Sequence, residues 1–145
     1  MTEENKFSLI KPTLDIPFHI DFNWWQQHDS DWRVFLLGLL CEEHQTAFAT
    51  LDENVVIDFI DPETAEVKPV DGLLHTLLSH CAKQGNFISN SGSLVGTVFR
   101  VYLSNNNSPL SSNQLSALIN RPAKTILVTL SSPNVYKGIR PIIQR

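Results

Sequence analysis

Thiol and imidazole side chains gather in two short segments of this sequence. Cys41 and His44 are three residues apart, while His80 and Cys81 are adjacent, with His75 a little earlier. Thiolates and imidazoles are the ligands that Zn²⁺ prefers, and a Cys-x-x-His spacing is compatible with a zinc site. On a helix, Cys41 and His44 can face the same way. The chemistry that these residue types could perform is therefore metal binding.

The second of these segments argues against a metal site. Adjacent residues on a helix point about 100° apart, so His80 and Cys81 are not expected to approach one ion together. Cys81 also continues the apolar spacing of the leucines before it, where a buried thiol is ordinary packing. We therefore expect a core cysteine, surface histidines, no cofactor and no metal required for folding. The alternative is a zinc site built from Cys41, His44, His80 and Cys81.

The other reactive residue types indicate no catalytic site. The sequence has no Gly-rich phosphate loop, nucleophile elbow or His-Glu-x-x-His motif. Asp58 and Asp61 flank the end of an expected strand, where carboxylates usually serve turn chemistry. A group of aromatic residues could line a ligand pocket, but such residues more often build a core. The group comprises Phe18, Phe22, Trp24, Trp25 and Trp32. We expect a protein that is not an enzyme.

Charge is divided unequally along the chain. Residues 1–71 hold all 15 carboxylates and four basic residues, a net charge of −11, whereas residues 72–145 hold seven basic residues and no carboxylate. The second part therefore carries +7, and the two parts sum to the −4 of the whole chain. A segment without carboxylates presents an unopposed positive field, which attracts polyanions. The asymmetry favours a polyanionic partner for the second half.

Length and composition set the remaining limits. With 145 residues, 42% of them hydrophobic, the chain can form one domain or two small ones. It has no run of about 18 apolar residues, and its polar N-terminus lacks the pattern of a signal peptide. Two cysteines do not make a disulfide framework. These features predict a cytoplasmic protein with free thiols and no membrane association.

The acidic part predicts an α+β unit over residues 15–84, after a flexible tail at 1–14. Apolar residues alternate through 15–22, which predicts an extended segment, and Pro17 favours an edge position. Ser30 is expected to cap a helix from Asp31 to about Ala47. Residues 54–60 and 65–70 predict a hairpin. Asp71 can then cap a helix whose apolar face runs to Cys81 and includes Leu74, Leu77 and Leu78.

The basic part predicts three helices. Ser93 can cap a helix with an apolar stripe that ends near Asn105. Ser111 and Gln114 form a capping box, and the flanking leucines Leu110 and Leu115 form a hydrophobic staple for a second, short helix. After a break at 120–122, Pro122 fits the first turn of a third helix. The buried face of that third helix comprises Ala123, Ile126, Leu127 and Leu130.

This order of elements, followed by a basic β-rich segment at 135–142, is the order of a winged helix-turn-helix. Residues 93–143 resemble the DNA-binding domains of bacterial winged-helix regulators. The resemblance implies that the third helix lies in the DNA major groove and that the basic strand touches phosphates. The residues then expected to contact DNA are Arg121, Lys124, Thr125, Val128, Lys137 and Arg140. Val128 cannot hydrogen-bond a base edge, although it can touch a thymine methyl group.

Together these patterns predict an α+β chain with an acidic helix and hairpin unit at 15–84 and a winged helix-turn-helix at 93–145. We expect a DNA-binding protein that serves as a transcription regulator, with double-stranded DNA as its partner. The acidic unit would regulate or assemble the DNA reader. Its apolar stripe around Phe35 and Leu36 could pack internally or form a homodimer. The alternative function is a protein-interaction adaptor that uses the same module without binding DNA.

Overall fold

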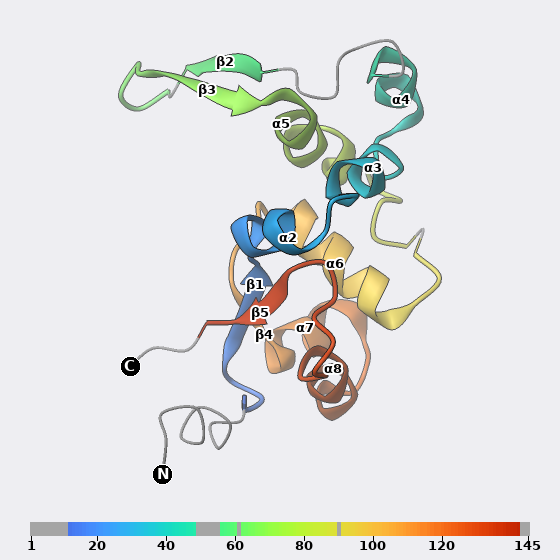
Figure 1. Cartoon of the computed structure of the whole chain (residues 1–145). Coiled ribbons are helices and arrows are strands. Elements are labelled where there is room, and N and C mark those ends of the chain that lie inside the picture. The colour runs from blue at the N-terminus through green and yellow to red at the C-terminus, as the bar shows by residue number, and fades with distance from the viewer. Residues whose placement is uncertain (1–11, 49–55, 61, 90, 143–145) are drawn as a thin grey trace.

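The chain folds into helices, a three-stranded antiparallel sheet and a separate hairpin, an α+β architecture (Figure 1). The computed structural model describes residues 12–48, 56–60, 62–89 and 91–142. Most of the expected tail at 1–14, Asp61 and the side chain of Asp58 lie outside the described residues. No helix within the described ranges is long and apolar enough to cross a membrane.

The three-stranded sheet joins the two ends of the sequence. Strand β1 (Pro17–Ile20) lies between β4 (Leu110–Ser111) and β5 (Ile139–Pro141), antiparallel to both. The expectation of an edge position for this segment is therefore wrong. Pro17 is the first residue of the strand, a position that tolerates the missing N–H. Phe18 and Ile20 point into the core and are 0% and 1% exposed.

The helix expected from Asp31 to about Ala47 is instead two short helices. Helix α2 (Phe22–His28) precedes them, and α3 (Trp32–Leu37) and α4 (Glu42–Phe48) are separated by four residues. Gly38 ends α3, in line with the low helix propensity of glycine. The N-cap of α3 is Asp31 and not Ser30 as expected. The break places Cys41 immediately before α4.

The hairpin forms as expected, and the helix that follows it is shorter than expected. Strand β2 (Val56–Ile60) pairs with β3 (Val67–Asp71). The Asp71 side chain accepts a hydrogen bond from the backbone N–H of Leu74 and caps α5 (Gly72–Ser79). His80 then leaves the helix with φ −127° and ψ −65°, and Cys81 begins the 3₁₀ helix η1 (Cys81–Lys83). The two residues are therefore not neighbours on one helix.

The three helices of the basic part form where the sequence predicts them. The Ser93 side chain caps α6 (Leu94–Ser104) by accepting from the Gly96 N–H at 3.1 Å. The Ser111 and Gln114 capping box begins α7 (Ser112–Ile119), and α8 is Ala123–Leu130. Pro122 is the N-cap of α8 and not, as expected, a residue of its first turn. Of the β-rich segment at 135–142, only Ile139–Pro141 is strand.

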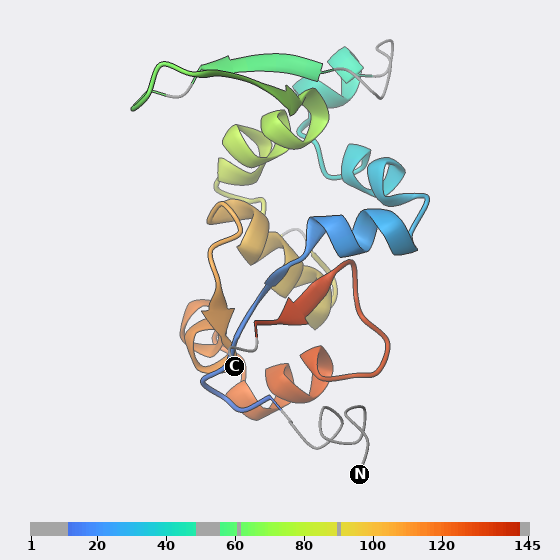
Figure 2. The same cartoon turned by 60° about the vertical axis from the view of Figure 1, so that its left-hand side comes forward.

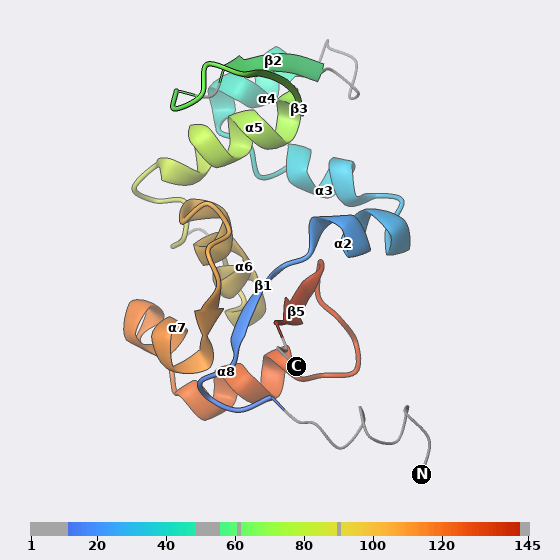
Figure 3. The ribbon, with the colours of Figure 1, turned by 90° about the vertical axis from the view of Figure 1, so that its left-hand side faces the viewer.

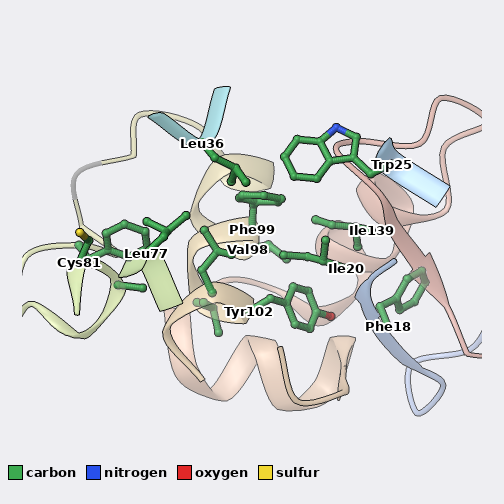
Figure 4. Packing of buried hydrophobic residues seen from close by; sticks show 14 of the residues in the cluster. Phe18, Ile20, Trp25, Leu36, Leu77, Cys81, Val98, Phe99, Tyr102 and Ile139 are labelled. Carbon is green, nitrogen blue, oxygen red and sulfur yellow. The ribbon is translucent and has the colours of Figure 1, made fainter. Parts of the chain in front are cut away.

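One continuous hydrophobic core connects the two parts of the sequence (Figure 4). Trp25 of α2 meets Phe99 of α6 edge-to-face, with ring centroids 5.6 Å apart. Leu77 of α5 and Tyr102 of α6 belong to the same cluster, as does Phe18 of β1. The hydrophobic cluster therefore includes residues of both expected units, 15–84 and 93–145. The segment 15–84 supplies the middle strand of the sheet that completes the basic part.

Candidate functional site

Helices α7 and α8 are held as a pair by their connecting turn. The α7 C-cap, Asn120, adopts the left-handed conformation with φ 56° and ψ 47°, which asparagine tolerates better than most residues. The Ser116 hydroxyl donates a hydrogen bond to the Arg121 carbonyl at 2.5 Å. At the other end of α7, Asn113 donates from its side chain to Asp15 at 2.8 Å. These contacts fix the orientation in which α8 is presented.

Four of the six residues expected to contact DNA lie together on this helix pair. Ile126 and Leu130 turn one face of α8 into the core. Lys124, Thr125 and Val128 lie on the opposite face, where Val128 is 74% exposed. Arg121 is exposed in the preceding turn. Within the described part of the chain, neither Arg121 nor Lys124 forms an ion pair with a carboxylate.

The other two expected contacts, Lys137 and Arg140, are engaged inside the fold. The Arg140 guanidinium donates to the Asp21 carboxylate at 3.2 Å and lies over the Trp24 ring. The Lys137 ammonium lies 3.8 Å from the Asp29 carboxylate. Figure 2 shows why: the segment after α8 runs along the molecule to α2 before β5 begins. Lys137 and Arg140 thus belong to the contact between α2 and β5, not to the surface of α8.

Gly138 fixes this contact in place. Its φ is +80°, and a Cβ there would lie 2.8 Å from the Trp25 Cβ and 2.9 Å from the Asp21 carbonyl oxygen. The Gly138 carbonyl also accepts a hydrogen bond from the Asp21 N–H at 2.7 Å. Both the backbone conformation and the close approach require glycine. The Gly138 turn therefore locks Lys137 and Arg140 against the acidic residues at the two ends of α2.

Asp29 contributes to the same contact from the end of α2. The backbone N–H of Asp31 and the indole N–H of Trp25 both donate to its carboxylate, at 2.9 and 3.1 Å. These hydrogen bonds, with a smaller contribution from nearby Lys137, hold the pKa of Asp29 below its usual value. The carboxylate is thus maintained in the charged form that Lys137 requires.

A cluster of thiols and imidazoles lies at the junction of α4 with α5 and η1. It consists of Cys41, His44, His80 and Cys81, and one ligand atom from each lies within 4.8 Å of the ligand atoms of all the others. The expectation that His80 and Cys81 cannot approach one point is therefore wrong. It assumed one continuous helix, whereas α5 ends at Ser79 and the chain turns between the two residues. His75 is not part of the cluster.

The distances within the cluster are short. The Sγ of Cys41 lies 3.1 Å from the Nδ1 of His44 and 3.6 Å from the Nδ1 of His80. The Sγ of Cys81 lies 3.5 Å from both the Sγ of Cys41 and the Nδ1 of His44. Cys81 is 1% exposed, and burial raises the pKa of its thiol to about 11. Its position in the core is as expected.

Beside the cluster lies a pocket of about 370 Å³. Cys41 and Cys81 form part of its wall, and Arg100 of α6 forms another part. The Arg100 guanidinium donates to the Phe87 carbonyl at 2.9 Å and stacks over the Phe87 ring, 4.8 Å from its centroid. The pocket therefore lies between the two cysteines of the cluster and Arg100 of α6.

The aromatic group around α2 mainly builds the core. Trp25 is 1% exposed and meets the rings of Trp32 and Phe35 edge-on, with centroids 6.0 Å apart in both pairs. Trp24 instead stacks on His28 at 4.0 Å, at the rim of a hollow of about 250 Å³ that Lys137 also lines. The packing of α2 against β5 therefore accounts for the positions of these aromatic side chains.

Comparison of the chain with family models, with curated proteins and with solved structures finds no match.

Proposed function

We propose that this chain is a DNA-binding protein of the winged helix-turn-helix type, acting as a transcription regulator. The observation that carries the proposal is the surface formed by the exposed face of α8 and the turn before it. Two cations that form no ion pair among the described residues lie there with a hydroxyl and an apolar side chain. Arg121 and Lys124 supply charge for phosphates. Thr125 can hydrogen-bond a base edge, and Val128 can touch a thymine methyl group.

The arrangement of helices and strands supports this proposal in a specific way. Three helices in the order α6, α7, α8 lie with a small antiparallel sheet whose outer strands, β4 and β5, come from the same part of the chain. A winged helix-turn-helix has this combination, with its second helix bracing the third in the major groove. Here the middle strand is β1 from residues 17–20, so no hairpin joins it to β5.

Placement of charge also supports the surface of α8 as the contact. The exposed Glu42 and Glu43 of α4, like Glu63 and Glu66 of the hairpin region, belong to the end of the molecule opposite α7 and α8 (Figure 3). These carboxylates and the α8 surface therefore lie at different ends of the molecule, and salt weakens the repulsion that such exposed carboxylates exert on phosphate.

The proposal gives Lys137 and Arg140 a smaller role than Arg121 and Lys124. A phosphate would have to displace Asp29 from Lys137 and Asp21 from Arg140, and the gain from the new contact is offset by the loss of the old one. Neutralising either residue should therefore change the salt dependence of DNA binding by less than the slope of about 0.9 that one phosphate contact contributes.

The test is duplex binding by the full chain, measured as fluorescence anisotropy of a short random-sequence DNA between about 50 and 200 mM salt. The double variant Arg121→Gln/Lys124→Gln should bind more weakly, with a salt slope lower by about 2. Lys83→Gln is the matched control, because Lys83 is exposed in η1 and donates to the Ser104 carbonyl far from α8. Unchanged affinity in the folded double variant would refute the proposal.

One observation favours protein interaction as a second candidate function. Leu118 of α7 and Val128 of α8 are 62% and 74% exposed, and apolar side chains at such exposure are typical of partner-binding surfaces when they cluster. Duplex binding by the wild-type chain separates the two functions, and Leu118→Gln tests whether the exposed apolar residue of α7 contributes to that binding. A DNA reader should retain its duplex affinity in this variant, whereas an adaptor should show no duplex binding even at low salt.

A further inference from the structure

The Cys41, His44, His80 and Cys81 cluster has a geometry that core packing does not explain. A buried thiol in a core needs no partner beyond apolar neighbours, which accounts for Cys81 alone. It does not account for two imidazole nitrogens, one from α4 and one from the residue after α5, that both approach the Cys41 sulfur. The α4 imidazole, His44, also approaches the Cys81 sulfur. The two contributing segments are separated by the whole hairpin in the sequence.

We propose that Cys41, His44, His80 and Cys81 bind one Zn²⁺ ion in a tetrahedral structural site. A tetrahedron with Zn–S bonds of about 2.3 Å and Zn–N bonds of about 2.0–2.1 Å has ligand atoms about 3.3–3.8 Å apart. The four short contacts among the Sγ and Nδ1 atoms measure 3.1, 3.5, 3.5 and 3.6 Å. Four of the six ligand–ligand distances of such a tetrahedron are thus already close to the spacing that zinc requires, and all four ligand atoms lie within 4.8 Å of one another.

The donor set matches zinc in chemistry as well as in spacing. Two thiols and two neutral imidazoles are a common structural zinc set, and soft thiolate donors disfavour Mg²⁺ and Ca²⁺. Binding releases the two thiol protons to solvent, so the two thiolates and Zn²⁺ together carry no net charge. That neutrality matters because Cys81 is buried, and an isolated buried thiolate would be costly.

The site is structural because all four positions of the tetrahedron are filled by protein. Catalytic zinc sites use three protein ligands and keep the fourth position for water or substrate. The pocket that Cys41 and Cys81 line lies beside the cluster. Zinc at this site therefore serves to join segments of the chain.

What it joins is helix α4. Among the described side chains of α4, from Glu42 to Thr46, none is buried, and only His44 is even half-buried. The helix also has only seven residues, which is too short to be stable without tertiary contacts. Coordination by His44 and by Cys41 at its start attaches α4 to Cys81, which belongs to the main core. The ion substitutes for the apolar burial that the described side chains of α4, from Glu42 to Thr46, do not provide.

A disulfide between Cys41 and Cys81 is the competing use of the two sulfur atoms. Both cysteines are free thiols, with their sulfur atoms 3.5 Å apart, and a disulfide would require about 2.05 Å. A disulfide would leave His44 and His80 without a role, although both direct their Nδ1 atoms at the sulfurs. The rings of these two histidines lie 4.6 Å apart and nearly perpendicular, so neither blocks the other.

The experiment uses the full chain, reduced and dialysed against metal-free buffer. Zinc content is measured by elemental analysis, and Co²⁺ is titrated as a spectroscopic probe of the same site. We expect one equivalent of zinc, and with Co²⁺ the intense visible absorption of a tetrahedral ion together with thiolate-to-metal charge transfer. A folded, reduced protein that shows neither would overturn the proposal. So would two thiols found oxidised to each other in the freshly purified protein.

Variants identify the ligands. His80→Ala changes an exposed residue, so the protein should still fold, which circular dichroism verifies. Loss of a residue that hydrogen-bonds a metal ligand lowers metal affinity about 10–100-fold. Loss of the ligand His80 itself should lower the Co²⁺ affinity by more than this. His75→Asn is the matched control, because His75 lies in α5 outside the cluster, and it should retain the wild-type spectrum. Equal loss of Co²⁺ affinity in both variants would contradict the assigned ligand set.

Discussion

Phe18→Ala is the substitution that best tests whether the two parts of the sequence fold as one unit. Phe18 is 0% exposed in the middle strand of the sheet, between Leu110 of β4 and Pro141 of β5 in register. Truncating a buried phenylalanine costs about 3–5 kcal/mol of folding free energy. In a chain of this length, such a loss lowers the melting temperature by about 10–20 °C.

The assay follows unfolding with two probes that report on different parts of the sequence. All three tryptophans lie between residues 24 and 32, so their fluorescence reports on α2 and α3. Amide signals of α7 and α8 in NMR spectra report on the helix pair. If one core unites the chain, both probes lose stability equally and their transitions coincide. Val128→Ala, at a 74% exposed position, is the control and should change stability by less than about 0.5 kcal/mol.

Separate transitions would refute this reasoning. If α7 and α8 kept their wild-type melting temperature in Phe18→Ala while the tryptophan signal shifted, then β1 would be a peripheral addition to an independent basic unit. The same reasoning predicts that a fragment of residues 85–145 does not fold alone, because it lacks β1 and the Trp25 side chain that covers Phe99.

Three further predictions follow from single contacts. Gly138→Ala should destabilise the protein by about 2–4 kcal/mol in urea unfolding, because the residue has φ +80° and its Cβ would lie 2.8 Å from an α2 side chain. Asp29→Asn should be less stable than wild type at neutral pH. Because the folded-state pKa of Asp29 is lowered, this difference should persist above the ordinary carboxyl pKa of about 3.9 and vanish as the pH falls through the folded value in melting curves. Asn107→Ala should cost about 2–3 kcal/mol in urea unfolding, since its side chain bonds both the N–H and the carbonyl of Ile20 at 2.8 Å. Asn106→Ala, at the same positive φ, is the control for backbone strain and should cost less.

Local structure of the basic part could be predicted because its signals are short in range. The Ser111 and Gln114 capping box, the Ser93 cap and the buried spacing of Ile126 and Leu130 each involve residues within one or two turns. Capping and helical periodicity act at that distance. The hairpin of β2 and β3 formed as predicted for the same reason, since its strands are close in sequence.

Elements that depend on distant partners could not be predicted in this way. The alternation at Phe18 and Ile20 indicated a strand, but the choice between edge and centre depends on β4 and β5, about 90 and 120 residues away. The aromatic and leucine run at 32–40 fits one helix, and only the break at Gly38 divides it. That break matters for function, because it frees Cys41 to approach residues at the end of α5.

The sequence-based prediction for the cluster was wrong because of the backbone conformation of one residue, His80. The 100° separation of adjacent residues holds only while a helix continues, and His80 leaves the helix with ψ −65° after a φ of −127°. An available signal lay in the sequence: polar Ser79 and His80 interrupt the apolar spacing just before Cys81. Periodicity should therefore exclude a ligand pair only where the helix is shown to continue through it.

The charge asymmetry of the sequence has two different consequences in the fold. Part of the positive charge is paired within the fold, because Lys137 and Arg140 form ion pairs with Asp29 and Asp21 where β5 packs on α2. These pairs are half-exposed, so each is worth at most about 1 kcal/mol, and they orient the two segments more than they stabilise them. Lys83 and Arg100 donate hydrogen bonds to backbone carbonyls of Ser104 and Phe87. Arg121 and Lys124 lie exposed on the helix pair and form no ion pair with a carboxylate of the described residues. A sequence-level charge count merges these two sets, whereas the fold separates cations that hold the chain together from cations that are available to a polyanion. The net +7 of the basic part therefore overstates the field that DNA would meet, and the local charge of α8 is the quantity on which binding should depend.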